Sequence, residues 1–243
     1  MAAYLLEAVA LFIAATGKVF PVALSFLGSD TLAAQTKGQA VLVPASHHVF
    51  GISMVWLLIV LLAASAVTHF LMASYLREFY EKNLAKRLTP IRWVGYGVGS
   101  GLMFVAAGLL LGVQDLAALV MLFTLAFGLH GLYAVSENAR QKSPQTGTVT
   151  YWVGTVMGVI AWLVLGLYVL GSQVYGVALD AWVWIIFLLM AAHVVAVAAS
   201  FCLHLRGTGK WSDVVYGDRV FLIGNFLGQS ALVWLIFAGS LRP

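Results

Sequence analysis

Charged side chains are scarce in this chain of 243 residues, in which Asp, Glu, Lys and Arg together make up only 9%. Soluble domains carry about 25% charged residues, whereas this chain is 62% hydrophobic with a mean hydropathy of +0.98. So few charges cannot cover a water-exposed surface, and we therefore expect an integral protein of the plasma membrane, in contact with the lipid bilayer. The net charge of +4 then reflects basic loops at one membrane face, and no nucleic-acid partner is expected.

Cysteine and catalytic motifs are scarce as well. The single cysteine, Cys202, excludes an intramolecular disulfide and a cysteine-based metal cluster. Because the sequence has no phosphate-binding loop, metal-hydrolase motif or nucleophile elbow, we do not expect an enzyme. Proton pumping is not expected either, because it needs titratable groups along a path through the membrane and no carboxylate is expected near the middle of a span. Glu7 is expected near the inner end of the first apolar segment, and Asp115 and Asp180 at the outer surface.

Seven apolar segments are long enough to cross a bilayer as helices, which takes about 20 residues each. Most of the Lys and Arg residues follow the second, fourth and sixth segments, which places these loops in the cytoplasm. We therefore predict an all-α membrane protein, a single domain over residues 1–243, with the N-terminus inside and the C-terminus outside. The expected spans are about 3–25, 50–75, 93–112, 116–136, 151–170, 181–203 and 219–238.

Two of the loops between these segments have features of their own. In the first external loop, a turn at 36–39 followed by the apolar run 40–43 predicts a short β-hairpin. The second loop, 77–92, is rich in charge of both signs. We expect it to form a contact surface for a cytoplasmic protein, the alternative being a solvated face that binds lipid headgroups.

The last apolar segment contains two amides. Asn225 and Gln229 are four residues apart and share a helix face, with Gly224 and Gly228 beside them. Small residues at this spacing let a neighbouring helix approach closely. Because an unpaired amide in hydrocarbon costs several kcal/mol, we expect this polar stripe to face the interior of the bundle.

A few further polar residues fall within the apolar segments. Lys18, in the first, is expected to extend to the outer headgroups. His69, His130 and His193 are expected to be hydrogen-bonded core residues, whereas His204 is expected to be solvated. Three intramembrane histidines also admit a haem or metal site, but their spacing lacks the pairing typical of membrane cytochromes, so haem is not expected.

Several sequence blocks along the chain form a recognisable pattern. They are His69-Phe70, Arg92-Trp93-Val94 with Tyr96, Trp162 with Leu167-Tyr168-Val169, Gly207-Thr208-Gly209-Lys210-Trp211-Ser212, Gly217-Asp218-Arg219, Ser230-Ala231-Leu232-Val233-Trp234, and Ile236-Phe237-Ala238-Gly239-Ser240-Leu241. These blocks resemble those of the heliorhodopsins. The resemblance covers essentially the whole chain and implies a rhodopsin-like bundle of seven transmembrane helices, an outer hairpin, a homodimer, and a light-sensing or regulatory role without ion pumping.

The chain departs from this family pattern at the residues that bind retinal. Heliorhodopsins hold retinal as a Schiff base on a lysine before the Ser-Ala-Leu run, and that position is Gln229 here. The counterion glutamate of the third helix corresponds to Gly95, and a serine of the seventh helix to Asn225. An amide has no nucleophilic amine and cannot form the imine. The resemblance therefore implies a homologue without covalent retinal.

The former retinal site has two expected states. Gly95 opens volume, so that Gln229, Asn225, Gly95, Tyr96, His69 and Trp162 line a cavity for an elongated apolar ligand or lipid; alternatively, Tyr96 or Trp162 fills it. We predict a non-pumping sensor or regulatory protein that acts through partners or a small apolar ligand. One alternative is a photoreceptor that binds retinal without a covalent bond or through Lys18. Another is a haem or metal protein that uses His69, His130 and His193.

Overall fold

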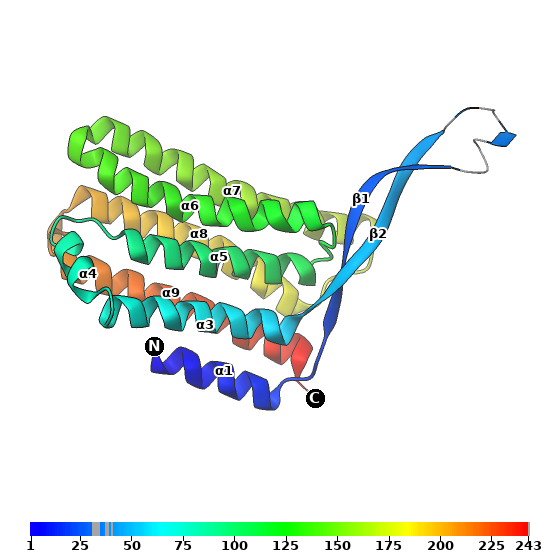
Figure 1. Ribbon diagram of the computed structural model, residues 1–243, viewed down its shortest axis with the longest axis horizontal. Coiled ribbons are helices and arrows are strands. Elements are labelled where there is room, and N and C mark those ends of the chain that lie inside the picture. Colours follow the sequence, from blue (N-terminus) through cyan, green and yellow to red (C-terminus); the bar gives the residue numbers. More distant parts are fainter. Residues whose placement is uncertain (31–34, 37–38, 40, 243) are drawn as a thin grey trace.

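The computed structural model describes residues 1–30, 35–36, 39 and 41–242. Long helices lie side by side in a bundle, and a two-stranded hairpin projects from one end (Figure 1). The N-terminus lies at the start of α1, which runs toward the hairpin end, where the C-terminus lies. The elements in chain order are α1 (Ala2–Ala14), β1 (Val19–Ser29), β2 (Leu42–Ser53), α3 (Met54–Ala73), α4 (Arg77–Leu84), α5 (Pro90–Leu110), α6 (Leu116–Lys142), α7 (Pro144–Tyr175), α8 (Ala181–Arg206), η1 (Gly209–Ser212), α9 (Val214–Ile236) and η2 (Phe237–Leu241).

Six helices of the described residues are long and apolar enough to cross a membrane. They correspond to the six predicted spans from the second onward, and the multi-pass membrane protein that composition predicts is thereby supported. The helix α1 is apolar but has only 13 residues, or about 20 Å at a rise of 1.5 Å each. That is shorter than the hydrocarbon core of a bilayer, about 30 Å.

The predicted first span, 3–25, is wrong in its second half. The helix ends at Ala14, and residues from Val19 onward form the strand β1, which pairs antiparallel with β2. The predicted span at 50 likewise begins in β2, and α3 starts at Met54. Apolar composition is compatible with either a helix or a strand. Here the segment forms a strand because its 11 residues pair with β2.

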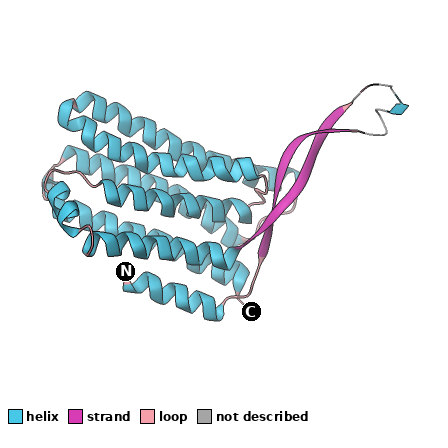
Figure 2. Ribbon diagram, in the orientation of Figure 1, coloured by secondary structure: helices cyan, strands magenta, loops and turns pink. Residues whose placement is uncertain are grey.

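The predicted hairpin is present, but it is not short, because β1 has 11 residues and β2 has 12 (Figure 2). Its expected turn at 36–39 includes residues 37 and 38, and the expected strand at 40–43 begins with residue 40. These three positions lie outside the described residues. From Leu42 onward, the expected strand is confirmed as part of β2.

Because α1 ends at Ala14, the expectation that Lys18 lies within the first span is also wrong. This residue follows the helix and directly precedes β1, at the hairpin end of the bundle. Its exposed side chain donates a hydrogen bond from Nζ to Ser240 Oγ at 3.1 Å. Lys18 is therefore not a lysine within a transmembrane helix.

The hairpin is attached to the turn between α5 and α6. The Ala23 amide donates to the carbonyl of Gln114 at 2.9 Å, and the Ser25 amide donates to Asp115 Oδ2 at 3.0 Å. The other carboxylate oxygen of Asp115 accepts from the amide of Ala118 and caps α6. One carboxylate thus joins the hairpin base to the start of a helix.

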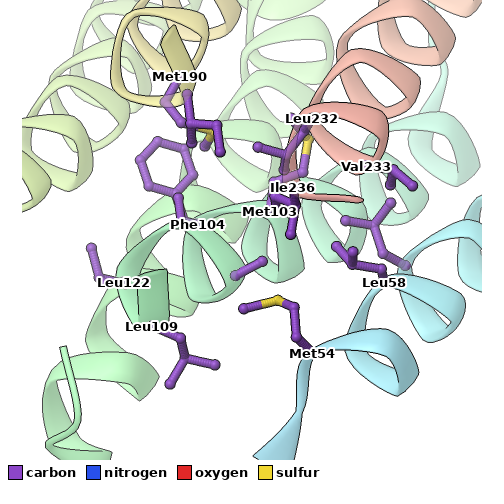
Figure 3. Packing of buried hydrophobic residues seen from close by; sticks show 14 of the residues in the cluster. Met54, Leu58, Met103, Phe104, Leu109, Leu122, Met190, Leu232, Val233 and Ile236 are labelled. Carbon is purple, nitrogen blue, oxygen red and sulfur yellow. The ribbon is translucent and has the colours of Figure 1, made fainter. Parts of the chain in front are cut away.

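The centre of the bundle is α5, the most buried of the six helices of span length among the described residues. Glycines allow α5 to lie buried among its neighbouring helices. A side chain at Gly97 or Gly101 would overlap Phe127 or Phe123 of α6, so only glycine allows the two helices to approach this closely. Toward the hairpin end, methionine and aliphatic side chains of α3, α5, α8 and α9 close the core (Figure 3).

We predict that Asp115→Ala releases the base of the hairpin. The substitution removes the acceptor for Ser25 and the cap of α6 together, so amide hydrogen exchange around residues 23–25 should accelerate. Asp115→Asn keeps one oxygen for the cap and should give an intermediate rate. Unchanged exchange in Asp115→Ala would show that the carboxylate does not anchor the hairpin.

The same contact has a defined pH dependence. Hydrogen bonds from Ser25 and Ala118 hold the pKa of the Asp115 carboxyl below its usual value. The anchor should therefore be complete above the ordinary carboxyl pKa of about 3.9 and weaken only as the pH falls through the lowered value. Hydrogen exchange measured at several pH values checks this, with correction for the intrinsic exchange rate.

Candidate functional site

The polar stripe of α9 faces the interior, as predicted, and its amides are hydrogen-bonded. Gln229 is 0% exposed and its Oε1 accepts from Ser65 Oγ of α3 at 2.6 Å. Its Nε2 donates to Asn225 Oδ1 at 3.5 Å, and Asn225 Nδ2 donates to Tyr4 Oη of α1 at 3.3 Å. A neutral hydrogen-bond chain thus joins α3, α9 and α1 where a Schiff base would stand.

The glycine that faces Gln229 is Gly99, not Gly95. A Cβ atom at Gly99 would overlap Gln229 Nε2, so the amide occupies the space that this glycine leaves. A Cβ atom at Gly95, one turn earlier, would overlap the side chain of Thr68 on α3. Gly95 therefore opens no space beside Gln229, but with Thr68 it lines a separate cavity of about 450 Å³ between α3 and α5.

His69 and Tyr96 lie close to the stripe. His69 Nδ1 is hydrogen-bonded to the carbonyl of Ser65 at 2.7 Å. The His69 ring lies 5.2 Å from that of Tyr4 and 6.4 Å from that of Tyr96, measured between centroids. The structure therefore brings together most of the predicted site residues around Ser65 and Tyr4, two residues that the sequence does not single out.

Trp162 lies apart from this group, at the contact between α7 and α8. Its Nε1 donates to the carbonyl of Phe187 at 3.2 Å, and its ring stacks on that of Phe187 at 5.0 Å. Trp162 also packs against the main buried core of the bundle. This core includes side chains that are 0% exposed, namely Met103, Phe104, Met190, Leu232 and Ile236 (Figure 3).

A carboxylate lies closer to the stripe than the sequence suggests. Glu7 of α1 is half-buried, and its Oε2 accepts from Ser230 Oγ of α9 at 3.0 Å. Because Ser230 directly follows Gln229, Glu7 lies beside the middle of α9 rather than at the inner end of a span. The position of Glu7 differs from the expected one because α1 has only 13 residues, so that Glu7 lies near its middle.

A groove between α8 and α9 lies next to the stripe, with a cavity volume of about 340 Å³. Its walls combine small and apolar residues with a few polar groups. The Tyr96 hydroxyl is buried and has no hydrogen-bond partner among the described residues. The lining residues are Tyr96, Leu189, Ala192, His193, Ala196, Val197, Ser200, Val220, Phe221, Gly224, Asn225 and Gly228.

The three intramembrane histidines do not meet at one point. His130 and His193 have ring centroids 6.3 Å apart, and His193 Nε2 is hydrogen-bonded to Ser100 Oγ at 2.8 Å. His130 Nδ1 is bonded to the carbonyl of Ala126, whereas His69 belongs to the stripe. Within the described part of the chain, no three His, Cys, Asp or Glu residues are grouped to hold a metal ion.

A buried ionic cluster at the α4 end of the bundle is the main feature that the sequence does not reveal. Arg92 is 0% exposed, although its place after a charged loop suggests a solvated residue. Its Nη1 lies 2.5 Å from Asp218 Oδ1, and its Nη2 lies 3.5 Å from Glu137 Oε1. The amide of Thr89 donates to Glu137 Oε2 at 2.6 Å. The only sequence signal is that Arg92 and Asp218 adjoin apolar segments.

Two further residues complete this cluster. Tyr80 of α4 is buried and donates from its hydroxyl to Asp218 Oδ1 at 2.5 Å. Burial raises the pKa of Tyr80 above its ordinary value, so the hydroxyl keeps its proton and remains a donor. His204 is only 2% exposed, with Nε2 at 3.9 Å from Glu137, so the expectation that it is solvated is wrong. Loop 77–92 is accordingly fixed to the bundle by Tyr80 and Arg92.

We predict that Arg92→Ala lowers the free energy of unfolding by about 3–5 kcal/mol, because it leaves Asp218 and Glu137 buried without their cation. The control is Arg219→Ala, which removes an exposed arginine and should cost less than about 0.5 kcal/mol. Thermal or denaturant unfolding in detergent micelles measures both. Equal losses would contradict the role assigned to the cluster.

The comparisons with known proteins agree with the geometry of this bundle. The family model described as Heliorhodopsin matches residues 2–241. No curated protein matches the chain. Because the family match covers nearly the whole chain, this membrane protein belongs to the heliorhodopsin family.

Proposed function

We propose that this heliorhodopsin is a non-pumping, non-catalytic sensor or regulatory protein that binds an elongated apolar molecule with a polar end. The binding site is the groove between α8 and α9. One observation carries the proposal: the Schiff-base position holds an amide that is hydrogen-bonded at both its oxygen and its nitrogen, whereas the adjacent groove retains volume and polar groups.

The chemistry of residue 229 supports the first half of this proposal. Gln229 offers no amine, and both ends of its amide are engaged, by Ser65 and Asn225. A polyene attached here would have to displace these hydrogen bonds.

The composition of the groove supports the second half. Its volume of about 340 Å³ falls within the range of 300–1,000 Å³ typical of small-molecule sites. Small residues of both helices, including Ala196 and Gly228, leave room for an apolar chain. The Tyr96 hydroxyl is a buried group in need of a partner, and it can take a hydrogen bond from a polar ligand end.

Retinal held in the groove without a covalent bond is the remaining photochemical alternative, since retinal is itself an elongated apolar molecule with a polar end. An imine with Lys18 has no such support. The Lys18 amine is bonded to Ser240 at the hairpin end, and α1 ends before Lys18.

The orientation and the assembly form part of the proposal. Basic residues are concentrated at the α4 end, in loop 77–92, in the last turn of α6 and from the end of α8 to the start of α9. By the positive-inside rule this end faces the cytoplasm, in the plasma membrane, with the C-terminus outside. The family resemblance favours a homodimer, and the charged loop 77–92 is the surface we assign to a cytoplasmic partner.

The purified protein should form no stable visible pigment with all-trans retinal. After mild detergent washing, absorption above 400 nm should disappear, and borohydride reduction should leave no retinyl adduct on any peptide. Absorption spectra and peptide mass mapping measure the two results. A washed preparation that keeps a visible band would overturn the proposal that this protein is not a retinal pigment.

The groove itself is tested by Ala196→Phe, which places a large ring in its lining. The control is Ala199→Phe on the same helix, since Ala199 is also exposed but lies outside the lining. The fluorescent fatty acid cis-parinaric acid should bind the wild type and Ala199→Phe equally. Ala196→Phe should bind it about tenfold more weakly, a loss of ~1.4 kcal/mol.

Equal binding by both variants would remove the groove as the site. Competition by all-trans retinal in the dark, without a covalent adduct, would instead favour the retinal alternative for the same groove.

A further inference from the structure

A second, smaller cavity lies at the α4 end of the bundle, apart from the α8–α9 groove. Its volume is about 180 Å³. Cationic residues of two elements meet there, Lys86 and Arg87 from the segment between α4 and α5, and Arg140 from α6. The remaining lining residues are Glu137, Gln141, His204 and Leu205.

The one acidic residue of this cavity is already engaged. Glu137 accepts hydrogen bonds from the amide and the hydroxyl of Thr89 at 2.6 and 2.9 Å, and it pairs with Arg92. Among the described residues, no carboxylate lies within 4.0 Å of the charged nitrogens of Lys86, Arg87 or Arg140. The cavity therefore carries uncompensated positive charge.

The segment that carries two of these cations is held in place by hydrogen bonds. Arg87 has a φ of 58°, a left-handed conformation that non-glycine residues adopt only when their surroundings impose it. Its Nη2 donates to the carbonyl of Ser212 at 2.7 Å. Gln141 Nε2 of α6 donates to the carbonyl of Lys86 at 2.9 Å. The backbone beside the cavity is thus fastened to α6 and to η1.

We propose that this cavity binds a phosphoryl group, either of free phosphate or of an anionic lipid headgroup. Several cations on a fixed scaffold suit a doubly charged group with several acceptor oxygens. Gln141 adds a neutral polar group to the lining. The cavity lies where helices of span length end and a charged loop begins, so both sources of phosphate can reach it.

The test uses the full chain in phosphatidylcholine nanodiscs, with two arms. In one arm, inorganic phosphate is titrated and the shift in thermal unfolding temperature is followed. In the other, the nanodiscs contain about 15% phosphatidic acid. A saturable stabilisation by phosphate assigns a free anion, and stabilisation by phosphatidic acid alone assigns a headgroup; each supports the proposal.

The variant for both arms is the double substitution Lys86→Gln and Arg140→Gln. Its matched control is Lys82→Gln in α4 with Lys142→Gln in α6, which removes the same charge at the same end of the bundle but outside the cavity lining. Arg87 is left intact because it holds the loop.

The cavity variant should require about tenfold more phosphate, or lose the stabilisation by phosphatidic acid, while the control behaves as the wild type. Equal weakening in both double variants would show only general attraction of anions to a basic surface and would overturn the proposal. So would the absence of stabilisation of the wild type in both arms.

Discussion

Arg92 imposes the strongest electrostatic constraint on this bundle. Its guanidinium is shut off from solvent, and a buried cation is tolerated only when charged partners and hydrogen bonds surround it. Asp218 of α9 and Glu137 of α6 supply the charges, and the rings of Trp93 and Phe221 lie 4.7 and 4.3 Å from its Cζ atom. Because Tyr80 also binds Asp218, this one cation holds α4, α5, α6 and α9 in register.

The polar site in the middle of the bundle is held together by neutral hydrogen bonds rather than by buried ion pairs. Where the family pattern has a lysine and a glutamate, this chain has neutral hydrogen bonds between Ser65, Gln229 and Asn225. A neutral network avoids the desolvation cost of an ion pair while it still satisfies every amide end. The fold is thus compatible with neutral residues at positions 95 and 229, while buried charge is retained in the cluster around Arg92.

The sequence predicts the helices after the first span well, because long apolar runs with basic loops between them leave few alternatives. It fails at residues 15–25, where the same composition suits a strand, and pairing with a segment more than 20 residues away decides the outcome. Gln229 and Asn225 could be found from their polarity in an apolar segment. The partners of Arg92 could not, since Glu137 and Asp218 are distant in sequence and only packing brings them together.

The groove and the ionic cluster share one side chain, which makes them physically continuous. Phe221 lines the groove and also lies against the Arg92 guanidinium. A ligand that displaced this ring would take an aromatic face away from a cation that has no water to replace it. The free energy of Arg92 burial therefore depends on the position of a groove residue. Asp218, which binds Arg92 and Tyr80, lies one turn before Phe221 on α9. Any displacement of the Phe221 ring therefore occurs beside the residue that holds Arg92 and Tyr80.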